Sequence, residues 1–187
     1  MALTKTPVCD FGKKAEDFKL KSINNKIVTL NDIQGEKATL IMFICNHCPY
    51  VKAIIKDLAK DCNELRNDGI NSVAIMSNDT KNYPEDSFDN MVNFAEINNF
   101  GEINYLFDET QEIAKKYGAV CTPDPFLFDS NKKLIYNGRI EDAMSPEAEV
   151  SEKVMINNIQ KFLEGQKIEK DFDPSIGCSI KWKEQQT

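Results

Sequence analysis

The part of this sequence most suited to chemistry is a pair of cysteines with a histidine between them, Cys45-Asn-His-Cys48. Two thiols at this spacing can close a disulfide and reopen it by thiol–disulfide exchange. The motif follows the apolar run 38–44 and precedes apolar residues that recur at helical spacing over 51–65. A CxxC between a strand and a helix predicts a redox pair; the alternative is two core cysteines that merely fall three apart.

The expected start of the helix suggests different roles for the two thiols. The first amides of a helix are unpaired and carry partial positive charge, so they lower the pKa of a nearby thiol. We expect Cys45, at the mouth of the helix, to be the exposed and more acidic nucleophile. Cys48 is expected to be covered and to resolve the mixed disulfide. A cationic His47 would stabilise the thiolate further and make the pair more oxidising; a solvated His47 without this role is the alternative.

A second candidate element is the segment Cys121-Thr122-Pro123, which comes shortly before an apolar stretch. X-Pro bonds adopt the cis form at low cost, so Pro123 is a candidate cis-proline. Cys121 could then be a third redox thiol, or a ligand of a soft-metal site together with Cys45 and Cys48. A small apolar residue packed beneath the loop is the interpretation of Cys121 that we favour.

The other cysteines carry weaker signals. Cys62 lies on the apolar stripe of its helix and is expected in the core. Cys178 belongs to the C-terminal tail and could reach the CxxC or Cys9 if the tail folds back, although a structural thiol is the favoured interpretation. The chain has one histidine and no second CxxC, which disfavours an ordinary zinc site. Because thiol exchange needs no cofactor, we expect neither a metal nor a cofactor.

Length and composition limit the class of protein. The chain has 187 residues, of which 41% are hydrophobic and 28% charged, as in one globular domain with a packed core. We expect a domain over residues 1–165 and a tail over 166–187 packed on it. A net charge of −7 without a basic stripe disfavours nucleic acid, and the longest apolar run is too short to cross a membrane. The N-terminus lacks an apolar signal region, so the expected location is cytoplasmic.

Strand and helix patterns alternate along the chain. This alternation predicts a mixed sheet with parallel βαβ units and hairpins at its edges. Residues 1–16 are expected to be an irregular lead-in. The expected elements are a hairpin over 18–30, strands over 38–44, 70–76 and 105–107, helices over 51–65, 84–98, 111–117 and 150–163, and a second hairpin over 126–136.

Several stretches together resemble the thioredoxin superfamily, and within it the redoxin branch of alkyl hydroperoxide reductases and thiol-specific antioxidants. They are Gly12-Lys-Lys-Ala-Glu-Asp-Phe18, Phe43-Ile-Cys-Asn-His-Cys-Pro49 and the segment from Tyr117-Gly to Asp129. A peroxiredoxin-like subgroup with a CxxC motif is the most similar, through Asn78-Asp79, Tyr83-Pro-Glu-Asp86 and Gly177-Cys-Ser-Ile-Lys-Trp182.

The resemblance implies an α/β thioredoxin-like fold. Its features are a central mixed β-sheet flanked by helices, an N-terminal β-hairpin and a C-terminal tail. The resemblance also implies that Pro123 is cis and that Thr122 and Pro123 pack against the CxxC.

The sequence departs from a peroxiredoxin at the position of the reactive cysteine. Peroxiredoxins carry a Pro-x-x-x-Thr/Ser-x-x-Cys pattern; if Cys48 takes the place of that cysteine, Ile41 replaces the proline and Cys45 replaces the hydroxyl residue. We therefore predict a thiol–disulfide oxidoreductase that acts on a protein or small-molecule thiol or disulfide and exchanges electrons with a separate donor. A thiol peroxidase with antioxidant function is the alternative, and a soft-metal module using Cys45, Cys48 and His47 or Cys121 is a third hypothesis.

Overall fold

The apolar run predicted to be a strand forms β4 (Ala38–Phe43), near the centre of the sheet, and all six of its residues are buried. β4 pairs in parallel with β5 (Ile70–Met76), which pairs in parallel with β6 (Asn104–Phe107). On its other side β4 pairs antiparallel with β8 (Asp124–Asp129). The computed structural model, which describes residues 2–7 and 10–184, thus has the mixed sheet of the predicted thioredoxin-like fold.

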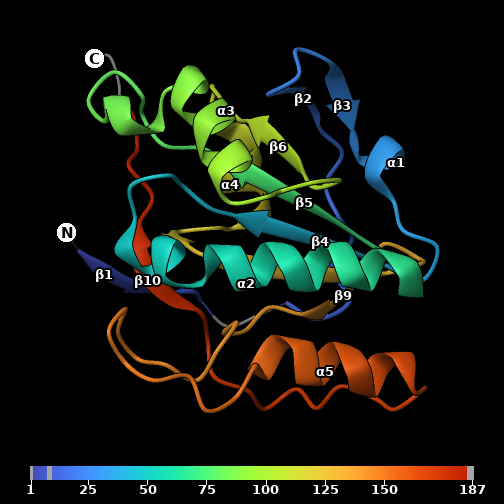
Figure 1. The fold of residues 1–187 in the computed structure, drawn as a ribbon. Coiled ribbons are helices and arrows are strands. Elements are labelled where there is room, and N and C mark those ends of the chain that lie inside the picture. Colours follow the sequence, from blue (N-terminus) through green and yellow to red (C-terminus); the bar gives the residue numbers. More distant parts are fainter. Residues whose placement is uncertain (1, 8–9, 185–187) are drawn as a thin grey trace.

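Hairpins form both edges of this sheet, whose strand order is β3-β2-β6-β5-β4-β8-β9 (Figure 1). At one edge β2 (Lys19–Ser22) pairs antiparallel with β3 (Ile27–Thr29), which confirms the predicted N-terminal hairpin. Asn25 adopts a φ of 64° in the turn, a left-handed conformation that asparagine tolerates well. At the other edge β9 (Leu134–Tyr136) pairs with β8.

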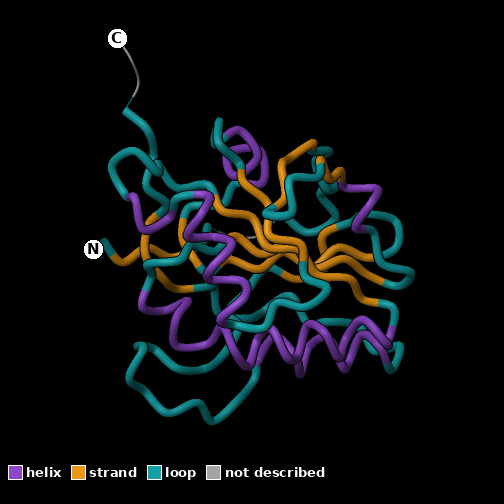
Figure 2. The backbone as a smooth tube through the Cα atoms, turned by 45° about the horizontal axis from the view of Figure 1, so that its top comes forward, coloured by secondary structure: helices purple, strands orange, loops and turns teal. Residues whose placement is uncertain are grey.

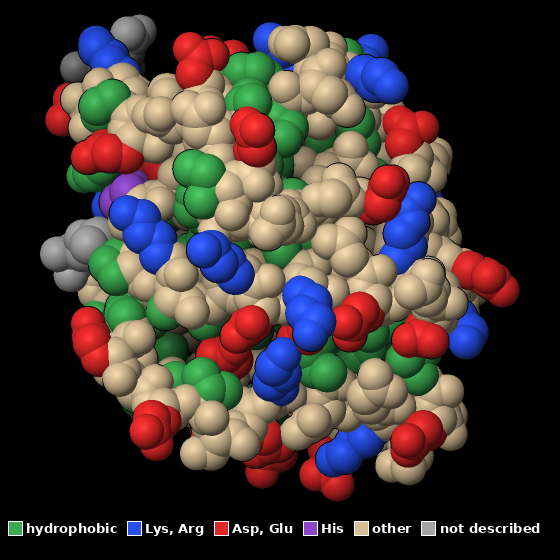
Figure 3. Space-filling view, viewed as in Figure 1, with side chains coloured by type: hydrophobic (Ala, Val, Ile, Leu, Met, Phe, Trp, Pro, Cys, Tyr) green, Lys and Arg blue, Asp and Glu red, His purple; other side chains and the backbone are tan. Residues whose placement is uncertain are grey.

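Helices cover both faces of the sheet (Figure 2). Side chains of β4 alternate between the faces, as in any strand. Leu40 and Met42 pack with α2 (Pro49–Leu65), α3 (Phe88–Ile97) and α5 (Val154–Leu163). Ile41 and Phe43 pack on the opposite face with α1 (Leu30–Ile33) and α4 (Glu112–Tyr117). Among the described residues, none of these helices combines the length and apolarity needed to span a bilayer. On the face shown in Figure 3, acidic and basic side chains are intermixed.

The helix predicted over 84–98 is interrupted. Residues Pro84–Asp86 form a 3-10 turn, and α3 begins at Phe88 because Ser87 caps it, with its hydroxyl accepting from the Asn90 amide. This break turns Asp86 inward, where it is fully buried. The last predicted helix also begins later than expected, at Val154.

Segments near the two ends of the chain and a short strand at residues 121–122 form a second, small sheet that was not predicted from the sequence. Its order is β1 (Leu3–Lys5), β10 (Ile176–Ser179) and β7 (Cys121–Thr122), all antiparallel. Figure 1 shows β10 passing beside the start of α2. The expectation that the lead-in is wholly irregular is therefore wrong, and the tail packs on the domain through backbone pairing.

Candidate functional site

The position at which α2 begins decides the environment of the CxxC. The helix starts at Pro49, so Cys48 is its N-cap and Cys45 lies three residues before that cap. Proline is well suited to the first helical position because its missing N–H has no intrahelical partner there. Cys48, rather than Cys45, is therefore the thiol at the positive end of the helix.

Both thiols lie against the loop that precedes β8. The Cys45 Sγ is 3.4 Å from the Thr122 hydroxyl, and the Cys48 thiol donates to the Thr122 carbonyl at 3.3 Å. The Thr122–Pro123 peptide bond is cis. The structure thus places Thr122, the residue before the cis-proline, against both cysteines, neither of which is in a disulfide.

The two thiols differ in acidity, in the order opposite to the one expected. The pKa of Cys48 is lowered to about 5 by hydrogen bonds to the Cys45 thiol, the Cys178 thiol and the Val51 amide, which outweigh its burial. The pKa of Cys45 is raised by its hydrogen bond to Cys48, by burial and by the nearby Asp86 carboxylate. Cys45 is only 1% exposed, so both premises of its role as the exposed, acidic nucleophile are wrong. Cys48 is 0% exposed, so acidity and not exposure distinguishes the two thiols.

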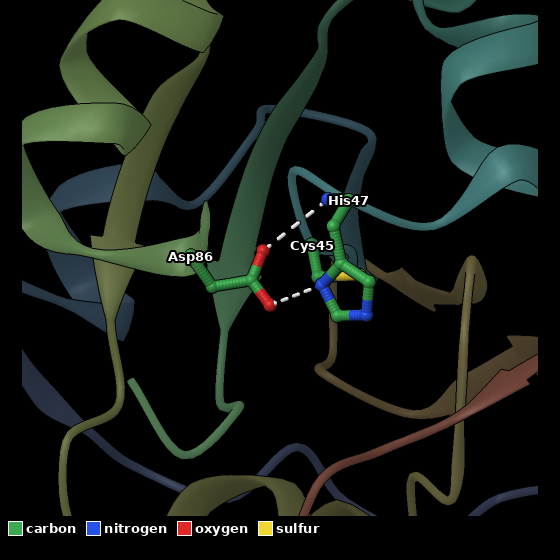
Figure 4. A group of neighbouring side chains, drawn as sticks. All are labelled: Cys45, His47 and Asp86. Atoms are coloured by element: carbon green, nitrogen blue, oxygen red, sulfur yellow. Dashed lines mark hydrogen bonds and ion pairs between the residues drawn. The ribbon is translucent and has the colours of Figure 1, made fainter. Parts of the chain in front are cut away.

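His47 is tied to a buried carboxylate. Its Nδ1 lies 2.6 Å from Asp86 Oδ2, which also accepts from Asn78 Nδ2 at 2.8 Å (Figure 4). The hydrogen bond to Asp86 raises the pKa of His47, although burial opposes this. Burial would raise the pKa of Asp86, but the bonds from His47 and Asn78 lower it instead. The positive charge of His47 is therefore paired with Asp86 rather than left to act on Cys45 alone.

Asp86 also binds backbone amides beside the first cysteine. Its Oδ1 accepts from the N–H of Asn46 at 2.7 Å and of His47 at 3.3 Å. Asp86 was not among the site residues predicted from the sequence, although the segment Tyr83–Asp86 belonged to the resemblance. The available signal was Ser87, a helix-capping residue type that separates this acidic turn from the helix after it.

Cys45, His47 and Asp86 also form a candidate metal-binding group. One ligand atom from each residue lies within 4.8 Å of the others. The His47 and Asp86 atoms already satisfy each other at 2.6 Å, so an ion would have to displace that hydrogen bond.

Cys121 lies deeper, behind the same loop. It is fully buried, and its Sγ is 3.5 Å from the Thr6 hydroxyl. Burial and the neighbouring Asp124 raise the pKa of Cys121 to about 12. Burial also raises the pKa of Asp124 to about 7, against hydrogen bonds from Thr6 and Asn137. This environment keeps the Cys121 thiol protonated at neutral pH.

The remaining cysteines lie in different parts of the molecule. Cys62 packs in the core on α2, as predicted, and burial raises its pKa to about 12. Cys178 on β10 faces the CxxC: it is the register partner of Thr122, and its thiol is hydrogen-bonded to that of Cys48. Burial and that neighbour raise the pKa of Cys178 to about 12. Cys9 lies outside the described residues.

The fold and the paired thiols define a thioredoxin-like redox protein. A sequence model of the AhpC/TSA family matches residues 11–137, more than half of the chain. The chain therefore belongs to the AhpC/TSA family, which confirms the predicted redoxin branch.

Solved structures extend the similarity over the whole chain. An uncharacterised conserved protein from Geobacillus kaustophilus is 41% identical, with a TM-score of 0.92 over 98% of this chain and 97% of that one. A hypothetical protein from Sinorhizobium meliloti 1021 is 34% identical, with a TM-score of 0.91 over 96% and 98%. The thioredoxin domain of a thiol-disulfide oxidoreductase from Bacteroides vulgatus shares the fold at 18% identity, with a TM-score of 0.64 over 83% and 99%. No curated protein sequence matches the chain.

Proposed function

We propose that this protein is a thiol–disulfide oxidoreductase that cycles Cys45 and Cys48 between a dithiol and a disulfide. The observation that carries the proposal is the contact between the two thiols at the N-cap of α2, where the pKa of Cys48 falls to about 5. A thiolate at neutral pH and a protonated partner in contact with it are the two groups that exchange requires.

The proposed cycle begins with the Cys48 thiolate. It attacks one sulfur of a substrate disulfide, whose S–S bond breaks, and the other substrate sulfur leaves as a thiolate. Cys45 then attacks Cys48 Sγ in the mixed disulfide; its proton passes to the departing substrate thiolate, and the Cys45–Cys48 disulfide forms. The cycle run backwards oxidises a dithiol. Protein and small-molecule disulfides are both suitable substrates, and a separate thiol donor closes the cycle without a metal or cofactor.

Thr122 and Pro123 are proposed to position the pair. The Thr122 hydroxyl and carbonyl contact Cys45 and Cys48 respectively, so one residue holds both sulfurs. His47 and Asp86 are proposed to act through the electrostatics of Cys45, whose ionisation the Asp86 carboxylate opposes.

The test is equilibration of the protein across a glutathione series, followed by alkylation and mass spectrometry of every cysteine. We expect a reversible disulfide that includes Cys48. A midpoint of about −270 mV would indicate a reductant, and one of about −120 to −180 mV an oxidant or isomerase. Cys48→Ser should abolish exchange, whereas Cys62→Ala, a control at a core thiol of the same helix, should leave it unchanged. If no disulfide that includes Cys48 forms at any glutathione redox potential, the proposal is refuted.

A thiol peroxidase remains a second candidate because the more acidic thiol is the one that aligns with the reactive cysteine of peroxiredoxins. In that reaction the Cys48 thiolate would take one peroxide oxygen, release an alcohol or water, and become a sulfenic acid. Cys45 would then condense with it to a disulfide and release water. Labelling of Cys48 by a sulfenic-acid-specific dione during peroxide titration would favour this reaction, and unchanged Cys48 thiol under excess peroxide would exclude it.

A further inference from the structure

The strand β10 lies directly over the paired thiols. It pairs antiparallel with β7, and Cys178 is opposite Thr122, the residue whose hydroxyl and carbonyl contact Cys45 and Cys48. The approach is unusually close at Gly177, where a Cβ would lie 1.9 Å from the Thr122 carbonyl oxygen. Only glycine permits this approach, so the backbone of β10 is held against the loop that carries the cis-proline.

Three sulfurs meet as a result of this packing. The Cys45 and Cys48 sulfurs both contact Thr122, whose register partner is Cys178, and the thiols of Cys45 and Cys178 are each hydrogen-bonded to that of Cys48. All three residues are buried, with exposures of 1%, 0% and 4% for Cys45, Cys48 and Cys178. In thiol–disulfide exchange the attacked sulfur must have the incoming thiolate and the leaving thiolate as its two neighbours. Cys48 has that central place between the other two.

We propose that Cys178 is a third redox thiol that competes with Cys45 for Cys48, so that the oxidised protein interconverts between a Cys45–Cys48 and a Cys48–Cys178 disulfide. This inference rests on the proposed function of the CxxC. In the step, Cys178 loses its proton and attacks Cys48 Sγ as a thiolate. The Cys45–Cys48 bond breaks, and Cys45 leaves as a thiolate that takes up the proton. One disulfide is lost and one is formed, so the step needs no external oxidant or reductant.

The exchange would couple the redox state to the C-terminal tail. A Cys48–Cys178 bond ties β10 covalently to the start of α2. In the dithiol form β10 is held by non-covalent contacts, which include two residue pairs with β7, three with β1 and the hydrogen bond from the Ile180 amide to the Val120 carbonyl. Because β10 covers Cys48, the strand is displaced from Cys48 more easily in the dithiol form than in the form with a Cys48–Cys178 disulfide. Cys178 would also resolve a mixed disulfide at Cys48 when Cys45 is absent.

The test uses dithiobis(nitrobenzoate), an aromatic disulfide that releases one coloured thiolate on attack and a second on resolution. Limiting reagent is added to the full-length protein, and disulfides are then mapped after alkylation. We expect Cys45→Ser to release two thiolates per reagent and to contain a Cys48–Cys178 disulfide. The double variant Cys45→Ser/Cys178→Ser should release one thiolate per reagent and retain the adduct on Cys48. Cys62→Ala should match the unmodified protein.

If the single variant Cys45→Ser keeps the adduct on Cys48, or if its Cys48 pairs with Cys9 or Cys121, the inference is overturned and the proposed function is left intact. Failure of the unmodified protein to release the second thiolate would instead refute the proposed function. If Cys45→Ser does not fold, by circular dichroism, the mapping of the unmodified oxidised protein decides. Detection of a Cys48–Cys178 disulfide as well as the Cys45–Cys48 disulfide supports the inference. Detection of the Cys45–Cys48 disulfide alone contradicts it.

Discussion

Replacement of Asp86 by asparagine tests whether His47 and Asp86 form a buried ion pair. The Asp86 side chain is fully buried, and four hydrogen bonds or contacts reach its two oxygens: two backbone amides at Oδ1, and Asn78 Nδ2 and His47 Nδ1 at Oδ2. Asp86→Asn keeps the shape, but it removes the charge and converts one acceptor oxygen into a donor amide. Two donors face Oδ2, so at least one of them loses its partner.

The expected cost follows from the burial of the pair. Loss of one partner of a buried ion pair costs about 3–5 kcal/mol. The His47 side chain is 13% exposed, and the oxygen of the new asparagine can still accept from the backbone amides. We therefore expect the free energy of unfolding to fall by about 3 kcal/mol near pH 5.5, at the low end of this range. For a chain of this size that loss lowers Tm by roughly 6–12 °C.

The loss should depend on pH in a defined direction. The pKa of His47 is raised in the folded state, so its contribution is complete below its ordinary value of 6.5 and disappears as pH rises through the folded value. The pKa of Asp86 is lowered, so its contribution is present above its ordinary value of 3.8 and disappears as pH falls through the folded value. The penalty of Asp86→Asn is therefore largest between these two ordinary values and smaller at alkaline pH.

Because His47 is the only histidine in the chain, its ring resonance can be followed by proton NMR without assignment. We expect its midpoint to lie above 6.5 in the unmodified protein and to fall in Asp86→Asn, with denaturant unfolding at pH 5.5 and 9 as the stability measurement. Asp79→Asn is a matched control, because Asp79 is buried in the same region but accepts from the Lys81 amide and Asn82. An unchanged His47 midpoint, or equal stability losses at both pH values, would refute the ion pair.

Two further predictions follow from the other shifted groups. With a pKa of about 5, Cys48 is almost fully ionised at pH 7, about 30-fold more than an ordinary thiol. The difference in thiolate absorbance between the unmodified protein and Cys48→Ser should therefore titrate near pH 5. A midpoint above pH 8 would contradict the assignment. The pKa of Asp124 is raised from 3.8 to about 7, so the unmodified protein should lose up to about 4 kcal/mol as pH rises from 4 to 8. Asp124→Asn should lack this loss in denaturant unfolding, and parallel pH profiles for the two proteins would count against it.

Those parts of the fold that carry their own local signal were predictable. β4 and β5 are mostly apolar runs, and α2 has an apolar stripe that ends at Leu65. The sheet of β1, β10 and β7 has no such signal, because strands of two to four residues are stable only through one another and their partners are far apart in sequence. The interruption at Ser87 was missed because the apolar residues of α3 continue a helical spacing that also accommodates the residues before it.

The site divides in the same way. The CxxC and the segment Thr122–Pro123 are local motifs, and both could be named from the sequence. Asp86 and Cys178 reach the CxxC only through tertiary structure: Asp86 through the turn before α3, and Cys178 through a strand that pairs across 56 residues, from Cys178 to Thr122. Each residue type was visible in the sequence, but no periodicity or spacing connects it to residues 45–48.

The relative acidity of the two active-site thiols, in contrast, had a local signal in Pro49. Because proline is favoured at the first helical position, it indicates that Cys48 is the N-cap, and therefore that Cys48 is nearest the free amides of the helix. The structure adds a second cause at Cys45, since the next two backbone amides, of Asn46 and His47, donate to Asp86. These are the amides that could otherwise have stabilised a Cys45 thiolate. One carboxylate thus removes the donors from the first cysteine and opposes its ionisation, while the helix start favours ionisation of the second, so the two effects act in the same direction.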